Sequence, residues 1–251
     1  SSDVCSSDLD YMFYKVYNKY RKEKNMVSTK DVVRLVHAHS SAIDKLMADE
    51  LRTTNEGVET WEGIISTEGS TKEAWEKAIH VMGHMALLRN LRNLEQHNVD
   101  TDLYLQKLID DVEKGKQLPF RYYSAYQNVT SAKIKRALET CMDKAVANLP
   151  KFEGKSLILV DNSGSARAER ISACGNATIA TAGNLMGVLT AMVSERGSKV
   201  GVFGNEIKYM PLSEGSQDVL GTLKTIDSLG ATVGMATENG IWLALKDAIE
   251  S

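Results

Sequence analysis

Apolar residues recur at helical spacing through residues 10–149, and short polar turns separate the successive stretches. Ser28-Thr-Lys-Asp and Ser70-Thr-Lys-Glu have the form of helix caps, and apolar residues at helical spacing follow each of them. Successive amphipathic helices with short connections are typical of an α-solenoid or an irregular helical array. We therefore expect residues 10–149 to form HEAT-like helical repeats without a β-sheet.

The end of this helical region should contain one loop between two helices. A helix is expected to start at Asp100 and to end near Gly115, and Pro119 is expected to begin a loop. Ser131 then precedes an amphipathic stretch and should cap the last helix before residue 149.

The pattern changes after Pro150 and Gly154, which punctuate a polar link. Residues 156–161 and 199–204 are short apolar runs, typical of strands that are buried on both faces of a parallel sheet. Residues 176–193 predict a helix between them, and residues 206–212 alternate like an edge strand. Further helices are expected at 216–227 and 238–250. The order strand, helix, strand predicts an α/β domain over residues 150–251 with a right-handed crossover.

A candidate metal site follows the first of these strands. In Asp161-Asn-Ser-Gly-Ser, one carboxylate and two hydroxyls, from Asp161, Ser163 and Ser165, are two residues apart on a tight loop. Hard oxygen ligands in this number, completed by water, suit Mg²⁺ or Mn²⁺. The other interpretation is an ordinary turn capped by Asp161. A serine hydrolase is disfavoured because Ser163 lacks the G-x-S-x-G context.

The strands, this serine motif and the later segment Gly230-Ala-Thr-Val-Gly-Met-Ala-Thr together resemble the von Willebrand A fold and its metal-ion-dependent adhesion site. The resemblance implies a partial doubly wound domain with a hydroxyl ligand from the second segment. Thr237 is preferred over Thr232 for that ligand. The start of a helix follows Thr237, and a glycine lies three residues after it, which is the pattern that the family often shows.

Three stretches of the helical region, residues 60–76, 82–93 and 118–126, resemble the TROVE module of the Ro ribonucleoprotein autoantigen family in its bacterial form. The resemblance covers about residues 26–250. It implies a non-enzymatic protein that binds small non-coding, Y-like RNA and the single-stranded ends of misfolded RNA. An exoribonuclease is a further partner that this interpretation allows.

Cationic and aromatic side chains in these stretches are the candidate RNA contacts. Arg89, Arg92 and Arg121 offer contacts to phosphate, and His84 and Tyr122, with Tyr123 and Tyr126 near by, offer rings for unpaired bases. The alternative is that the rings lie in the core and the arginines pair with acids. If the arginines bind RNA, they should be partly exposed and line one surface.

Composition limits the classes of function and the cellular location that fit the chain. The net charge of -3 gives no global basic surplus, and no apolar run approaches the roughly 20 residues that span a bilayer. Three scattered cysteines fit neither a disulfide framework nor a metal cluster, which favours the cytoplasm. Residues 1–9 are expected to be a non-native leader, and the chain to be a fragment of a longer protein. A second function also stays open. In it, an adhesion-type A domain captures a protein carboxylate through its metal, and the helices are a scaffold.

Overall fold

The computed structural model of the chain divides into two compact units, Ser1–Gly63 and Ile64–Ser251. In the first unit, helix α2 (Thr29–Val36) lies near a segment whose Met47 carbonyl accepts a hydrogen bond from Lys30 Nζ. The expected leader at 1–9, the start of the first amphipathic stretch and the capping residue Ser28 lie outside the described residues. The structure describes residues 27, 29–40, 43–44, 47–48, 60–171, 177–194, 198–210, 218–237 and 239–250.

Helices joined by short turns make up residues 60–148, as the sequence predicts, and no strand occurs among the described residues before 149. The helices are short and follow one another closely along the chain. They are α4 (Trp61–Glu68), α5 (Lys72–Val81), α6 (His84–Gln96), η2 (Thr101–Leu103), α7 (Leu105–Asp110), α8 (Val112–Gly115), α9 (Pro119–Gln127), α10 (Ala132–Ala145) and η3 (Val146–Asn148).

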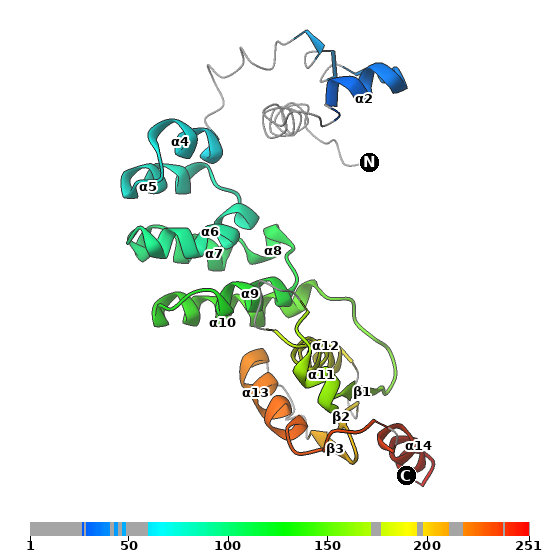
Figure 1. Ribbon diagram of the computed structural model, residues 1–251. Coiled ribbons are helices and arrows are strands. Elements are labelled where there is room, and N and C mark those ends of the chain that lie inside the picture. Colours follow the sequence, from blue (N-terminus) through cyan, green and yellow to red (C-terminus); the bar gives the residue numbers. More distant parts are fainter. Residues whose placement is uncertain are drawn as a thin grey trace. The chain divides into compact units, whose positions relative to one another are not determined.

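These helices stack in layers, with α6 and α7 in one layer and α9 and α10 in the next (Figure 1). α10 contributes a continuous buried face, because its apolar residues recur at the spacing of one helix side. Long side chains join the layers: Lys107 Nζ on α7 donates to the carbonyls of Ile79 and Met82 at the end of α5. The buried residues of α10 are Ile134, Ala137, Leu138, Cys141, Met142 and Ala145.

The helices begin where the capping pattern predicts, except that the cap of α5 lies one residue later than expected. Ser131 caps α10 as predicted, and its side chain accepts a hydrogen bond from the backbone N–H of Ile134. α5 is capped by Thr71 rather than Ser70, since the Thr71 hydroxyl accepts from Ala74 N. Ser70 Oγ instead accepts from the indole N–H of Trp75 at 2.9 Å, which ties the preceding loop to the helix.

Two expectations about residues 100–130 are wrong. Pro119 does not begin a loop but stands in the first turn of α9, where its missing N–H costs no hydrogen bond and its fixed φ suits a helix. The single helix expected from Asp100 to Gly115 is divided into η2, α7 and α8. α8 ends at Lys116, whose φ of 46° lies in the left-handed region and closes the helix.

The α/β region holds a three-stranded mixed sheet in the order β1-β2-β3, which are Leu157–Asp161, Lys199–Phe203 and Ile207–Met210. β1 and β2 pair in parallel, with Asp161 opposite Phe203, which confirms the predicted relation of the two apolar runs. β3 pairs antiparallel to β2 and forms an edge of the described sheet, as predicted. Pro211 lies outside the described residues. The helices of this region are α11 (Gly164–Ala168), α12 (Ile179–Met192), α13 (Val219–Gly230) and α14 (Gly240–Glu250).

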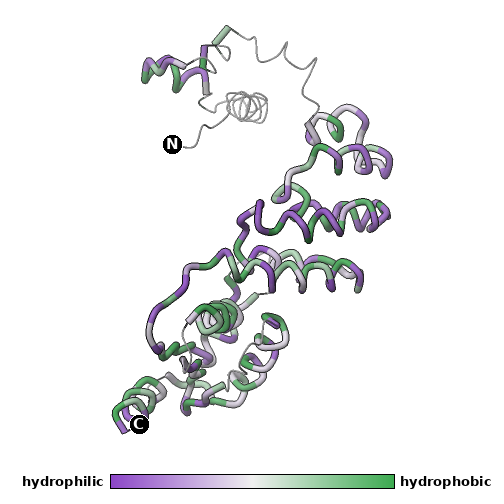
Figure 2. Tube along the Cα trace, turned by 180° about the vertical axis from the view of Figure 1, so that it is seen from behind, coloured by the Kyte–Doolittle hydropathy of each residue, from purple (hydrophilic) through white to green (hydrophobic). Residues whose placement is uncertain are grey.

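α12 packs directly on the sheet through two glycines. A Cβ atom on Gly187 would lie 2.7 Å from a methyl carbon of Val160, and one on Gly183 would lie 3.0 Å from the same side chain. The absence of side chains there lets the helix approach β1 closely. α12 is mostly apolar, with green the prevailing colour of this helix in Figure 2, which is typical of a helix buried on several sides.

The helical layers and the α/β region contact each other between α10 and α13. Asp143 on α10 accepts a hydrogen bond of 2.9 Å from the backbone N–H of Val219, the first residue of α13. The contact satisfies one of the free N–H groups at the start of that helix. Among the described residues, no helix is both long and apolar enough to cross a bilayer.

Candidate functional site

Arg89, Arg92 and Arg121 are all exposed and line one pocket of about 310 Å³ between α6 and α9. Arg89 and Arg92 are three residues apart and therefore share one side of α6, while Leu87 and Leu94 of that helix are buried in the core. Arg121 joins them because α9 packs beside α6. The geometric part of the prediction, three exposed arginines on one surface, is confirmed.

None of the three guanidinium groups pairs with a carboxylate of the residues that the structure describes. Arg121 instead lies over the ring of its neighbour Phe120, with its guanidinium carbon 5.5 Å from the ring centroid. Guanidinium groups without a carboxylate partner leave their N–H donors and their positive field available to a ligand. We call this site, lined also by apolar residues and three side-chain amides, the arginine pocket.

His84 and Tyr122 lie in the core and cannot stack on RNA bases, which corrects their predicted role. Tyr122 has no exposed surface, and His84 is 8% exposed. Their side chains share a hydrogen bond of 2.6 Å between His84 Nε2 and the Tyr122 hydroxyl, joining α6 to α9 below the arginine pocket. The His84 ring also packs against Gly115, where a Cβ atom would come within 2.2 Å of it. The pair therefore fixes the two helices that carry the arginines.

Burial shifts the titration of this pair. It lowers the pKa of His84 below its ordinary value of 6.5, against the opposing effect of Asp111, and it raises the pKa of the Tyr122 phenol. His84 Nδ1 is buried and has no hydrogen-bond partner among the described residues. The neutral imidazole is thus the form that the fold favours. The other two tyrosines of this block, Tyr123 and Tyr126, are only half-buried.

The loop after β1 places the predicted metal ligands together. Asp161 Oδ1 accepts a hydrogen bond of 2.8 Å from the backbone N–H of Ser163, and the hydroxyls of Ser163 and Ser165 lie 3.4 Å apart. Ser163 is buried and Ser165 is exposed, so the group faces outward from the end of the sheet. One carboxylate with two neighbouring hydroxyls fits a hard divalent cation. In the described part of the chain, no three His, Cys, Asp or Glu side chains form a metal cluster, so a cation here would depend on the hydroxyls.

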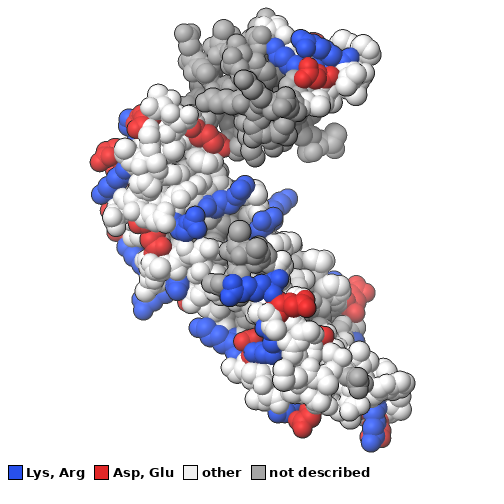
Figure 3. Space-filling model, in the orientation of Figure 1, with Lys and Arg blue, Asp and Glu red and all other residues white. Residues whose placement is uncertain are grey.

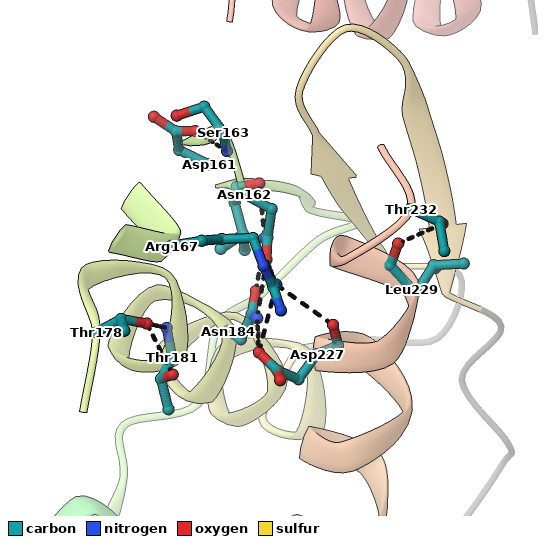
Figure 4. A network of polar contacts seen from close by, with 11 residues as sticks. Asp161, Asn162, Ser163, Arg167, Thr178, Thr181, Asn184, Asp227, Leu229 and Thr232 are labelled. Carbon is teal, nitrogen blue, oxygen red and sulfur yellow. Dashed lines mark hydrogen bonds and ion pairs between the residues drawn. The ribbon is translucent and has the colours of Figure 1, made fainter. Parts of the chain in front are cut away.

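The two candidate threonines differ in what their hydroxyls contact. Thr232 Oγ1 donates to the carbonyl of Leu229 at 2.7 Å (Figure 4). The same hydroxyl accepts from Lys208 Nζ at 2.9 Å. Thr237 is exposed, and its segment contacts the metal loop two residues earlier, where the Met235 carbonyl accepts a 2.8 Å hydrogen bond from Gly164 N. The prediction that Thr237 is the nearer ligand therefore stays open.

A buried polar network behind this loop was not predicted. The side-chain amides of Asn162 and Asn184 exchange two hydrogen bonds of 2.8 and 3.1 Å, and Asn184 Nδ2 also donates to Asp227. Arg167 donates to Asn162 Oδ1 at 2.9 Å and forms an ion pair with Asp227 (Figure 4). The network joins the loop after β1 to α12 and α13. The only signal in the sequence is a polar Asn162 directly after an apolar strand.

The comparisons with known proteins agree with this architecture. The TROVE domain family matches residues 12–158, more than half of the chain, and the chain therefore belongs to the TROVE domain family. This confirms the resemblance predicted from the three helical stretches. No curated protein matches the chain.

Among solved structures, the chain is similar to the Ro (RSR) protein of Deinococcus radiodurans. The TM-score is 0.61 at 15% sequence identity, over 92% of this chain and 56% of that one. At this identity the match establishes a common fold, and the chain spans little more than half the length of the solved protein.

Proposed function

We propose that the chain is a non-enzymatic RNA-binding protein of the Ro type, which binds small non-coding, Y-like RNA and single-stranded ends of misfolded RNA. The observation that carries the proposal is the arginine pocket, where Arg89, Arg92 and Arg121 are exposed and have no carboxylate partner among the described residues. Membership of the TROVE domain family supports the same function.

The local charge supports phosphate binding despite the net charge of -3. A guanidinium group presents a planar set of donors that matches a phosphate, and a cluster of three creates a positive field over a short range. Figure 3 shows lysine and arginine side chains gathered over the helical layers in the middle of the view. A chain of phosphates that passes this surface would exchange its counterions for these side chains.

The salt dependence of binding tests the proposal. For a fluorescent single-stranded RNA, Arg121→Ala should weaken binding and reduce the slope of log K against log salt by about 0.7, the value for one lost phosphate contact. Arg136→Ala is the matched control, because Arg136 is an exposed arginine on α10 that does not line the pocket. An affinity and a slope left unchanged by Arg121→Ala would remove Arg121 from the RNA site.

We further propose that the region after residue 150 is the amino-terminal part of a von Willebrand A-type domain with a divalent-cation site. Asp161, Ser163, Ser165 and Thr237 would hold Mg²⁺ or Mn²⁺, and the support is the contact of the two serine hydroxyls beside the carboxylate. The position at the carboxyl end of a parallel strand is the usual ligand site of such sheets. A bound cation would supply an electrophilic centre for a partner carboxylate or a phosphate.

Removal of metal by a chelator distinguishes the proposed cation site from the proposed RNA site. Calorimetric titration with Mn²⁺ should detect binding to the chain, and Asp161→Asn should weaken it at least tenfold because the only charged ligand is lost. RNA binding that is sensitive to salt and insensitive to EDTA fits the first proposal. Binding of a protein ligand that EDTA abolishes would favour the adhesion-type alternative, in which the helices are a scaffold.

A further inference from the structure

The arginine pocket contains three side-chain amides, from Asn93, Gln117 and Asn128, and each is held in one orientation. Gln117 Nε2 donates to the carbonyl of Gly115 at 2.8 Å, and Asn128 Nδ2 donates to the carbonyl of Ser124 at 2.7 Å. A backbone carbonyl can only accept, so these contacts fix which end of each amide is the nitrogen. The amide oxygens of both residues have no hydrogen-bond donor among the residues described.

Asn93 is fixed in the same way through a second asparagine. Asn90 Nδ2 donates to the carbonyl of Ala86 at 2.9 Å, which leaves Asn90 Oδ1 to accept from Asn93 Nδ2, also at 2.9 Å. The oxygen of Asn93 is then the end without a partner in the described chain. The pocket thus combines three amide oxygens that are free to accept with three arginines that can only donate.

The rest of the lining and the size of the pocket fit one nucleotide. A volume of about 310 Å³ is at the lower end of the range for small-ligand sites. An unpaired base needs an apolar surface for its ring and hydrogen-bonding groups at its edge, with cations near by for the phosphate. The apolar residues of the lining are Met85, Leu88, Leu91, Ala125 and Val129.

We propose that the arginine pocket holds a single unpaired nucleotide and selects a base that carries an exocyclic amino group. The amino group of cytosine, adenine or guanine would donate to the free amide oxygens, while the arginines contact the adjacent phosphates. Uracil has a carbonyl oxygen in place of the amino group of cytosine, and the amide oxygens cannot donate to it while the arginines contact the phosphates. The inference rests on the proposed RNA-binding function and adds to it a preference between bases.

Two pyrimidine oligonucleotides test the preference, because cytosine and uracil have the same size and differ in the amino group. The 251-residue chain should bind (rC)9 about tenfold more tightly than (rU)9, the discrimination expected of one good base contact. Both affinities are measured by fluorescence anisotropy at the same salt concentration.

The double variant Gln117→Met with Asn128→Leu removes two acceptors without a change of charge. It should bring the affinity for (rC)9 down to that for (rU)9 and leave the salt slope unchanged. Gln106→Met is the matched control, because Gln106 is an exposed amide on α7 outside the pocket. A circular dichroism spectrum and a urea unfolding curve like those of the control exclude a folding defect.

The outcomes separate this inference from the proposed function. Equal binding of (rC)9 and (rU)9 by the unmodified chain would overturn the base preference, and so would a preference that survives in a folded double variant. In either case the effect of Arg121→Ala on the salt slope decides separately whether the chain binds RNA through the arginines. If Arg121→Ala also has no effect, the proposed function itself fails at this site.

Discussion

The two candidate sites hold their polar groups in opposite ways. In the arginine pocket, the guanidinium groups have no carboxylate partner and the amide oxygens have no hydrogen-bond donor in the described chain, and apolar packing beneath them fixes their helices. Behind the loop after β1, the buried amides of Asn162 and Asn184 bond to each other and to the half-buried Arg167 and Asp227. Polar groups left free at a surface are available to a ligand, whereas polar groups satisfied in the interior stabilise the fold. Substitutions in the two places should therefore affect different measurements.

The largest effect on stability is expected from Asn162. Replacing it by Leu removes the hydrogen bonds to Asn184 and Arg167 and leaves buried polar groups unpaired, which should lower the free energy of unfolding by about 2–4 kcal/mol. Arg121→Gln in the arginine pocket should change it by less than about 0.5 kcal/mol. Urea unfolding of both variants makes the comparison. Equal destabilisation would show that the contrast between the two sites is wrong.

A smaller loss is expected below the arginine pocket. Tyr122→Phe removes the hydroxyl that bonds to His84 Nε2 and leaves a buried imidazole without a partner on either nitrogen, at a cost of about 1–3 kcal/mol. Because this pair joins α6 to α9, the variant should also weaken RNA binding while the salt slope stays the same. Thermal unfolding and the salt titration test the two effects. A Tyr122→Phe variant as stable as the original chain would contradict the structural role of the pair.

The stability of the chain should also depend on His84 as the pH falls. The folded state lowers the pKa of His84, so the unfolded chain binds a proton first, and stability that is fully present above pH 6.5 is lost as the pH falls through the lowered pKa. Burial raises the pKa of Glu95, but hydrogen bonds from Thr130 and Ser131 lower it by more, to below 4.5. The stability that Glu95 contributes is therefore lost only at a lower pH than that of His84. His84→Gln should flatten the curve below pH 6.5. Parallel curves for the two proteins would exclude His84 as the cause.

Substitutions of Thr232 and Thr237, beside the proposed cation site, should differ only in their effect on metal binding. Thr237→Val should weaken Mn²⁺ binding severalfold if Thr237 supplies a ligand, while Thr232→Val should leave it unchanged because that hydroxyl already contacts Leu229 and Lys208. Both residues are exposed, so either change should alter the free energy of unfolding by less than about 1 kcal/mol. Calorimetry with Mn²⁺ distinguishes them. The reverse pattern would assign the ligand to Thr232.

The sequence predicts those features that show in a pattern of residue types along the chain. Ser131 caps its helix through a residue three positions on, and the parallel pairing of β1 and β2 follows from two apolar runs joined by a helix. Pro119 was assigned to a loop because proline breaks most helices, although it is favoured in the first turn. The family resemblance rests on local sequence and is likewise confirmed.

Features that depend on particular side-chain contacts between distant residues leave no such pattern in the sequence. His84 and Tyr122 are 38 residues apart, and only the packing of α6 on α9 decides that their rings are buried rather than open to a ligand. Asn162 and Asn184 are 22 residues apart, and neither residue alone indicates a buried amide pair. The shared surface of the three arginines was expected from the sequence, and the packing of α6 beside α9 shapes that surface into a pocket.

The central claim is that local charge in the arginine pocket, rather than the total charge, binds RNA. Two triple variants with the same change of net charge test it most directly: Arg89, Arg92 and Arg121 replaced by Gln, and Lys133, Lys135 and Arg136 on α10 replaced by Gln. In a salt titration of single-stranded RNA binding, the pocket variant should lose about 2 from the slope of log K against log salt, about 0.7 for each phosphate contact. The α10 variant should keep the original slope. Equal losses in both variants, or no loss in the pocket variant, would contradict the account.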